Sequence, residues 1–316
     1  MRRWLLRIAA ALGVALLAVA YLALQEDEPL KPRTRPAWLK QELYPFQDRW
    51  MDVDGHVVHY VDEGHGPVLL MLHGNPTWSF VYRHLIRELS GSYRCIALDY
   101  PGFGLSTARP GYGFTPREHS QVVEKFALAL DLKDATLMVQ DWGGPIGLGF
   151  AGRHPDRVRA LVIGNTWAWP ANGDSRFEGF SNLMGGPVGR FAILNFNAFA
   201  AWIVPTLVGH PLSRDEKRAY RGPFPTRASR LPTAIFPREI LASRDYLAEV
   251  EAGLPRLADK PALIVWGPKD RGFRGRQERF EKLFPDHRTV LLENASHFVQ
   301  EDEPGRIAAE IRGFVR

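Results

Sequence analysis

Residues 137–150, LMVQDWGGPIGLGF, decide the fold. The apolar run 135–139 is typical of a buried strand, and the glycine-rich segment after it opens a helix. A sharp strand-to-helix turn holds its central side chain above the end of the strand, within reach of a substrate. Ester hydrolases place a serine there, as Gly-x-Ser-x-Gly, whereas this chain has Asp141 followed by Trp142. The stretch therefore predicts a carboxylate in the position of a nucleophile.

Strand and helix patterns alternate on both sides of this stretch. Asp54-Gly55, between the first two expected strands, is typical of a hairpin turn. Apolar strands that alternate with helices predict an α/β fold, in which a mostly parallel sheet has helices on both faces. The expected strands are 50–54, 56–62, 68–72, 95–98, 135–140, 158–163, 262–266 and 289–292, and the expected helices are 79–89, 115–130, 144–153, 275–283 and 305–315.

The alternation stops between two of these strands. Residues 169–256 contain helix-like pieces broken by many glycines and prolines, with no convincing buried strand. We expect this insertion above the carboxyl ends of the strands, where open α/β sheets bind ligands. The predicted organisation is a core domain of residues 44–168 and 257–316, and a helical cap of residues 169–256 that closes a pocket.

The composition is that of an ordinary globular chain. The 316 residues have a net charge of +5, with 40 Lys and Arg scattered among 35 Asp and Glu. Without a basic stripe we expect a solvated surface and no nucleic-acid partner. The single cysteine, Cys95, lies in an apolar run and is expected to be buried and inert. The histidines lack metal-ligand spacing, so no metal site is expected.

The N-terminus resembles a membrane or export signal. Arginines precede residues 8–24, which are apolar and uncharged. At about 1.5 Å per residue this run spans roughly 25 Å, the short end for a membrane helix. We expect residues 1–24 to be an uncleaved anchor, residues 25–43 an extended linker, and the catalytic domain periplasmic or extracytoplasmic. The alternative is a signal peptide cleaved near Ala18-Val19-Ala20, which gives a secreted protein.

Four chemically active stretches follow predicted strand ends. Asp141, Asp270 and His297 occur in the order nucleophile, acid, histidine, as in hydrolase triads. Singly, Asp141 could cap a helix, Asp270 could cap a turn and His297 could be a core histidine. Because they share one edge of the sheet, we expect a single catalytic site. The stretches are His73-Gly74-Asn75-Pro76, Gln140-Asp141-Trp142-Gly143-Gly144, Gly267-Pro268-Lys269-Asp270 and Ala295-Ser296-His297-Phe298.

From Tyr44 to Arg316 the chain resembles the haloalkane dehalogenases. The matching segments are YPFQDRW, HYVDEG, LHGNPTWSFVYR, DYPGFGLS, VQDWGGPIGL, VWGPKD and ASHFVQEDEP, and HGNPTWS combined with QDWGG is quite specific. The cap matches least, and the N-terminal segment is outside the usual pattern. The resemblance implies an α/β-hydrolase fold, with an eight-stranded mostly parallel sheet and an inserted helical cap. It also implies a small apolar halogenated substrate and no cofactor, and it leaves the oligomeric state open.

The resemblance also implies roles for the site residues. Asp141 would be the nucleophile, His297 the base and Asp270 the acid that orients the base. Asn75 and Trp142 would bind the halide, and their backbone N–H groups would form the oxyanion hole.

This arrangement looks like the third subfamily of the dehalogenases. In the second subfamily a glutamate supplies the acid, at the place where this chain has Asn165. In the first, a cap tryptophan replaces the asparagine, which leaves Trp167 or Trp169 as an alternative halide donor.

The chemistry of a carboxylate agrees with these roles. An alkyl halide has no carbonyl, so it needs a nucleophile for displacement at saturated carbon, and an aspartate is ionised at neutral pH without a base. The departing halide needs N–H donors in a dry pocket, which Trp142 and Asn75 can supply. The resulting ester of Asp141 can then be hydrolysed by water that His297 activates.

Other functions share parts of this constellation. An epoxide hydrolase also attacks through an aspartate but activates the ring oxygen with two cap tyrosines, for which Tyr220 and Tyr246 are candidates. A β-lactone decarboxylase can share the whole constellation. A tethered binding module without activity would need none of Asp141, Asp270 and His297, so their presence argues against it.

Overall fold

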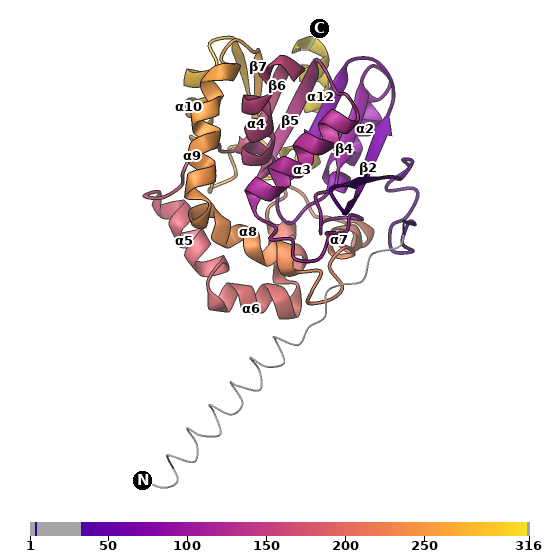
Figure 1. The fold of residues 1–316 in the computed structure, drawn as a ribbon, viewed down its shortest axis with the longest axis vertical. Helices are drawn as coiled ribbons and strands as arrows, with labels where there is room; N and C mark the ends of the chain where they lie inside the picture. Colours follow the sequence, from indigo (N-terminus) through magenta and orange to yellow (C-terminus); the bar gives the residue numbers. More distant parts are fainter. Residues whose placement is uncertain (1–3, 5–32, 315–316) are drawn as a thin grey trace. The chain divides into compact units, whose positions relative to one another are not determined.

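The structure is a computed structural model that describes Trp4 and residues 33–314 (Figure 1). Apart from Trp4, the predicted membrane or signal segment, residues 1–24, lies outside the described residues. Residues 33–314 belong to one compact unit, which contains every element discussed below.

An eight-stranded sheet lies at the centre of this unit, with the strand order β1-β2-β4-β3-β5-β6-β7-β8. Strand β2 pairs antiparallel with β1 and β4, and all other neighbouring strands are parallel. The predicted mostly parallel sheet is therefore confirmed. The strands are β1 Arg49–Val53, β2 His56–Glu63, β3 Val68–Leu72, β4 Arg94–Leu98, β5 Ala135–Asp141, β6 Val158–Thr166, β7 Ala262–Trp266 and β8 His287–Leu291.

Helices cover both faces of the sheet, as the alternating pattern predicts. Alternate residues of the central strands point to opposite faces, so Leu70 and Leu72 belong to one apolar cluster while Leu69 and Met71 belong to another. The helices of the core are α2 Arg83–Leu89, α3 Pro116–Ala129, α4 Gly143–Arg153, α10 Gln277–Leu283, α11 Val299–Asp302 and α12 Pro304–Phe314. Helices α3 and α4 contribute to the first cluster, and α2 and α12 to the second (Figure 1).

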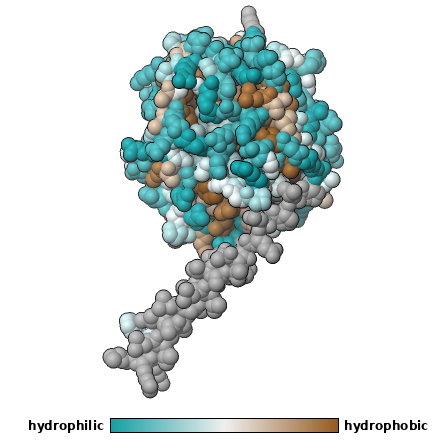
Figure 2. Space-filling model, in the orientation of Figure 1, coloured by the Kyte–Doolittle hydropathy of each residue, from teal (hydrophilic) through white to brown (hydrophobic). Residues whose placement is uncertain are grey.

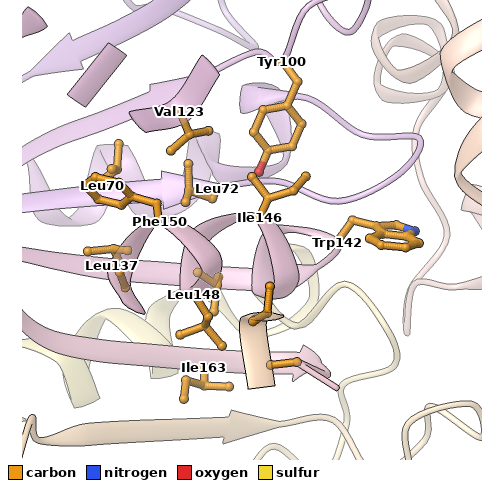
Figure 3. Close-up of a cluster of buried hydrophobic side chains, with 14 of the residues drawn as sticks. Leu70, Leu72, Tyr100, Val123, Leu137, Trp142, Ile146, Leu148, Phe150 and Ile163 are labelled. Carbon is orange, nitrogen blue, oxygen red and sulfur yellow. The ribbon is translucent and has the colours of Figure 1, made fainter. Parts of the chain in front are cut away.

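The first cluster reaches the end of β5, where the catalytic stretch was predicted. All seven residues of β5 are buried. Figure 3 shows Leu137 of β5 packed among side chains from neighbouring strands and α4, and it shows Trp142 at the edge of the group drawn. The ring of Trp142 packs against Trp167 and Phe236, which belong to the same cluster. The core therefore fixes the position of β5, and Asp141 and Trp142 at the end of this strand line the cavity described below.

The segment between β6 and β7 is helical, as expected. Its helices are α5 Ser175–Met184, α6 Pro187–Phe196, α7 Arg214–Arg221, α8 Leu231–Ala242 and α9 Arg244–Gly253. Figure 1 shows α5, α6 and α8 together beyond one end of the sheet. We call residues 169–256 the cap; the boundaries of a separate cap domain stay a prediction.

The described half of the predicted linker is not extended. The guanidinium of Arg35 donates to the carboxylate of Asp48 at 2.7 Å and to the carbonyl oxygens of Tyr44 at 2.6 Å and Phe46 at 2.7 Å. Leu39 is buried among core residues. The prolines of this region suggested a tether, but these contacts attach residues 35–43 to the core.

Among the described residues, no single helix has the length and apolar character to cross a membrane. Helix α6 and the following turns, Phe199–Thr206, reach the length and apolar character of a membrane span only when they are taken together. The two segments are bent by 82° relative to each other.

Candidate active site

Asp141 occupies a strained turn between β5 and α4. Its φ is +50°, in the left-handed region that few residues other than glycine, asparagine and aspartate adopt. The turn passes close to the end of β3, where a Cβ on Gly143 would lie 2.0 Å from the carbonyl oxygen of Leu72. The sequence of the turn therefore suits a conformation that lifts the side chain at position 141 above the sheet.

The carboxylate of Asp141 is buried but not isolated. Its Oδ1 accepts a hydrogen bond from the backbone N–H of Asn75 at 2.8 Å, and the backbone N–H of Trp142 is a further donor. A Cβ on Gly74 would lie 2.3 Å from Asp141 Oδ1, so only glycine fits there. Burial raises the pKa of Asp141 above its ordinary value of 3.8, and the two N–H donors and His297 oppose this rise.

His297 lies between the two aspartates. Its Nδ1 is 2.7 Å from Asp270 Oδ2, and its Nε2 is 3.6 Å from Asp141 Oδ2. Burial alone would lower the pKa of His297, but the negative charges of Asp270 and Asp141 outweigh burial and raise this pKa above 6.5. The three predicted triad residues thus meet at one point.

Asp270 is held in its charged form by several donors. Burial alone would raise its pKa, but His297, the side chain of Asn165 and the backbone N–H of Gly272 lower it below 3.8. Asn165 Nδ2 donates to Asp270 Oδ2 at 3.0 Å, and Asn165 Oδ1 accepts from the N–H of Gly267 at 2.8 Å. Asn165 therefore supports the acid from β6.

Gln140 is a partner of the histidine that no sequence motif indicated. Gln140 Nε2 lies 3.1 Å from His297 Nε2 and donates to the carbonyl oxygen of His297 at 3.0 Å. A carbonyl can only accept, so this contact orients the amide with its NH₂ group toward the imidazole. Gln300 Nε2 donates to Gln140 Oε1 at 3.3 Å and supports the same orientation. A glutamine carries no motif of its own; only its place beside Asp141 could have pointed to it.

The predicted halide donors lie at the cavity. Trp142 and Trp167 pack edge to face with ring centroids 4.6 Å apart, and both line the cavity with Asn75. Among the described residues, the buried Nε1 of Trp167 has no hydrogen-bond partner, so it remains available as a donor. Trp169 instead packs against Phe280, with ring centroids 5.0 Å apart, and does not line the cavity.

A proline in the cap orients Asn75. Asn75 Nδ2 lies 3.5 Å from the carbonyl oxygen of Thr233 in α8. In a helix that oxygen would accept from the N–H four residues later, but Pro237 occupies that position and has no N–H. The free carbonyl can therefore turn to the amide of Asn75, and it connects the cap to the predicted halide site.

The cavity between core and cap has a volume of about 220 Å³. Its walls are mainly aromatic and aliphatic, and its polar groups come mostly from the predicted site. The lining residues are Asn75, Asp141, Trp142, Trp167, Arg176, Phe177, Phe180, Phe199, Leu207, Pro237, Ile240, Asp270, Gly272, Phe273 and His297. A few polar groups in an apolar cavity suit a small apolar molecule that reacts at one end.

The two cap tyrosines do not belong to this cavity. Tyr220 donates its hydroxyl to Glu301 at 2.6 Å, and Tyr246 donates to the carbonyl oxygen of Pro145 at 2.8 Å. Neither residue lines the cavity. They are therefore not placed to activate an epoxide oxygen above Asp141.

A cluster of side chains outside the cavity contains residue types that can bind metal ions. His84, Glu216 and Glu301 bring potential ligand atoms within 4.8 Å of one another. The guanidinium of Arg83 already donates to both carboxylates, to Glu216 at 2.7 Å and to Glu301 at 2.6 Å. A guanidinium between the carboxylates neutralises the charge that would attract a cation, so the cluster is a structural ion-pair network.

Comparisons with known proteins show which family this chain belongs to. Residues 67–304 match the family model of the alpha/beta hydrolase fold. The chain is 45% identical over 273 residues to haloalkane dehalogenase 2 of Mycobacterium tuberculosis, a match that covers 85% of this chain and 95% of that protein. It is 34% identical to the cis-3-alkyl-4-alkyloxetan-2-one decarboxylase of Xanthomonas campestris over 291 residues, or 86% of this chain and 97% of the relative.

A solved structure supports the same relationship. The crystal structure of haloalkane dehalogenase DbeA from Bradyrhizobium elkani is similar with a TM-score of 0.78 and 28% sequence identity. The match covers 85% of this chain and 97% of that one. Sequence and structure together show that the chain belongs to the α/β-hydrolase fold family and, within it, to the haloalkane dehalogenases.

Proposed function

We propose that this protein hydrolyses the carbon–halogen bond of small haloalkanes to an alcohol, a halide ion and a proton, through a covalent ester on Asp141. The observation that carries the proposal is the carboxylate of Asp141 in an apolar cavity, with His297 Nε2 3.6 Å from its Oδ2 and Asp270 behind the histidine. This geometry provides a nucleophile for carbon and a separate base for water.

The first step is displacement at saturated carbon. Asp141 Oδ1 is held by the N–H of Asn75, which leaves Oδ2 to attack. A bond forms between Oδ2 and the substrate carbon while the carbon–halogen bond breaks and the halide takes the electron pair. The indole N–H of Trp142 and the amide of Asn75 stabilise the charge that develops on the halide. Trp167 offers a third N–H on the same wall.

The second step is hydrolysis of the ester. His297 removes a proton from water, and the oxygen attacks Cγ of Asp141. The backbone N–H groups of Asn75 and Trp142 stabilise the negative charge on Oδ1, and Asp270 stabilises the imidazolium. The ester bond then breaks, and the alcohol leaves with the proton that His297 holds. The carboxyl group of Asp141 loses the remaining proton of the water, which restores the carboxylate and accounts for the proton released overall.

Halide release from brominated alkanes tests the proposal. We expect steady release by the wild-type chain and none by Asp141→Asn, with equal molar amounts of alcohol and halide. If a folded preparation releases no halide but decarboxylates an oxetan-2-one, the reaction is that of the decarboxylase relatives. If it opens epoxides instead, the conclusion that Tyr220 and Tyr246 cannot activate an epoxide oxygen is wrong.

We also propose that residues 1–24 anchor the protein in a membrane, with the catalytic domain on the periplasmic or extracytoplasmic side. The apolar run 8–24 after a group of arginines supports this proposal. Membrane extraction and the intact mass of the native protein test it: an uncleaved chain should stay with the membrane in high salt. A soluble protein shortened near residue 20 would indicate a cleaved signal peptide.

A further inference from the structure

The outer surface of the cap carries most of the exposed large apolar side chains of the described chain. Phe191 is 60% exposed, Phe196 56% and Trp202 58%. The three rings form a chain of contacts. The ring centroids of Phe191 and Phe196 lie 5.9 Å apart, and Phe196 stacks on Trp202 with centroids 6.2 Å apart. Figure 2 shows apolar residues at the lower end of the domain, in the region of α6. We call Leu183, Val188, Phe191, Phe196 and Trp202 the cap patch.

The cap patch lies in a strongly basic part of the chain. Residues 179–238 contain eight Lys and Arg but only two Asp and Glu, whereas the whole chain has 40 and 35. The basic excess of the protein is therefore concentrated in this segment. A solvated surface would be expected to mix both signs of charge and to expose few aromatic rings.

Among the described residues, no acidic partner is found for Arg190, Arg227 and Arg230 near α6, whereas Arg238 pairs with Glu239 at 3.1 Å. Arg190 and Arg230 donate to backbone carbonyl oxygens, and Arg227 donates to the amide oxygen of Asn195 at 2.8 Å. Burial and the positive charges of Arg238 and Arg227 lower the pKa of Arg190. The arginines therefore repel one another, and negative charge brought to this surface would relieve that repulsion.

The cap patch continues to the cavity. Phe180 lines the cavity, is 38% exposed and precedes Leu183 by one helical turn in α5. Phe180 also contacts Phe199, a second lining residue, with ring centroids 6.2 Å apart. The member of the cap patch on α5, Leu183, thus lies one helical turn from a residue of the cavity wall.

We propose that the cap patch docks on the surface of an anionic lipid bilayer. Aromatic and aliphatic side chains enter the boundary between headgroups and acyl chains, while the surrounding arginines contact phosphate groups. Lipid fits both features, because nucleic acid would satisfy the arginines but leave the aliphatic side chains without partners. This docking does not depend on the proposed reaction; it would bring the cavity next to the phase in which apolar substrates accumulate.

A fluorescent probe in the full-length chain tests the docking. The only native cysteine, Cys95, is fully buried, so a cysteine introduced as Phe191→Cys can be labelled selectively with NBD. The matched control is Leu128→Cys, which replaces a residue 40% exposed in the last turn of α3, before the amino end of β5. With vesicles of equimolar phosphatidylcholine and phosphatidylglycerol, the label at 191 should brighten and shift to the blue, and the label at 128 should not.

Charge variants test the lipid selectivity. Adding Arg227→Gln and Arg238→Gln to the labelled chain should lower its affinity for the vesicles about 30-fold, at roughly a factor of five per arginine. The affinity is read from the lipid concentration at which the fluorescence change is half complete. Lys133→Gln with Arg157→Gln, at the amino ends of β5 and β6, should leave the response unchanged.

Four outcomes would overturn the proposal. Equal responses at 191 and 128 would mean that only the N-terminal segment tethers the protein. If the emission of the label at 191 is already blue-shifted in buffer without vesicles and the shift grows with protein concentration, a second copy of the protein covers the cap patch. If the same shift does not change with protein concentration, a segment of the protein's own chain covers the cap patch. A response to duplex DNA equal to that with vesicles would indicate a nucleic-acid surface.

Discussion

At the scale of single residues, the contacts of Asp141 and His297 support the roles proposed for them. Asp141 Oδ1 accepts from the backbone N–H of Asn75, and Oδ2 lies 3.6 Å from His297 Nε2. His297 Nδ1 faces Asp270, which leaves Nε2 as the basic atom. The two oxygens and the two nitrogens are thereby distinguished, as a two-step reaction requires.

Gln140 should keep Nε2 of His297 in its basic form. Its amide N–H points at that nitrogen, and a donor there favours the neutral ring over the imidazolium. Gln140→Met should therefore raise the pKa of His297, move the acid limb of ester hydrolysis to higher pH and slow this step about tenfold. Pre-steady-state halide release measures the first step separately and should be nearly unchanged. A variant that slows both steps equally at every pH would show a structural role only.

The pH dependence should differ between the two chemical steps. The pKa of His297 is raised above 6.5, so the base is lost as the pH falls through a value above 6.5. The pKa of Asp141 is also raised from 3.8, but displacement needs only the Asp141 carboxylate and does not need a neutral imidazole. The ester should therefore accumulate in mildly acidic buffer, which acid quenching followed by mass spectrometry detects. An ester population that falls with falling pH would refute this difference between the two steps.

The predicted site residues that lie together in the structure are those with a chemical signature in the sequence. Asp141, Asp270 and His297 could be found because they follow strand ends in the order of a triad, and the structure brings them together. Gln140 could not be found, because its partner His297 is 157 residues away and a buried glutamine has many structural uses. Tertiary contacts of this kind leave no periodic trace in a sequence.

At the scale of elements, α8 carries a connection between cap and site. Pro237 frees the carbonyl of Thr233, which then lies 3.5 Å from Asn75 Nδ2. Pro237→Ala should restore the helical hydrogen bond and release the Asn75 side chain, so displacement should slow several-fold while thermal stability is kept or increased. Single-turnover halide release and a melting curve check this. Unchanged displacement with a more stable helix would show that the carbonyl does not orient Asn75.

The elements with strong periodic signals were predicted well. The hairpin of β1 and β2 forms at Asp54-Gly55, both with positive φ, and α3 begins with the capping box of Thr115 and Glu118. Strand β8 begins two residues before the prediction, since it is an edge strand with three exposed residues and a weak apolar pattern. The cap helices could not be bounded, because Pro237 lies inside α8 where a proline normally predicts an end.

At the scale of the whole molecule, a buried ion pair connects the cap, α2 and the segment after His297. The side chains of Arg83 and Glu301 are fully buried, and Tyr220 of α7 also donates to Glu301. Glu301→Gln leaves Arg83 with Glu216 as its remaining charged partner, so it should reduce the free energy of unfolding by about 2–4 kcal/mol. Denaturant unfolding measures this.

The exposed pair of Arg117 and Glu249 is the matched control. Glu249→Gln should cost about 0.5 kcal/mol or less, because solvent screens that pair. Equal losses for the two variants would contradict the view that the buried network holds the cap to the core.

The central claim is that an oxygen of Asp141 bonds to substrate carbon, and His297→Phe tests it most directly. This variant keeps the nucleophile and the halide donors but removes the base, so the intact mass after incubation with a bromoalkane should rise by one alkyl group in place of one hydrogen. Peptide mapping should place that group on Asp141, and the double variant with Asp141→Asn should gain none. Halide release that continues without a trapped ester, or an alkyl group on another residue, would contradict the account.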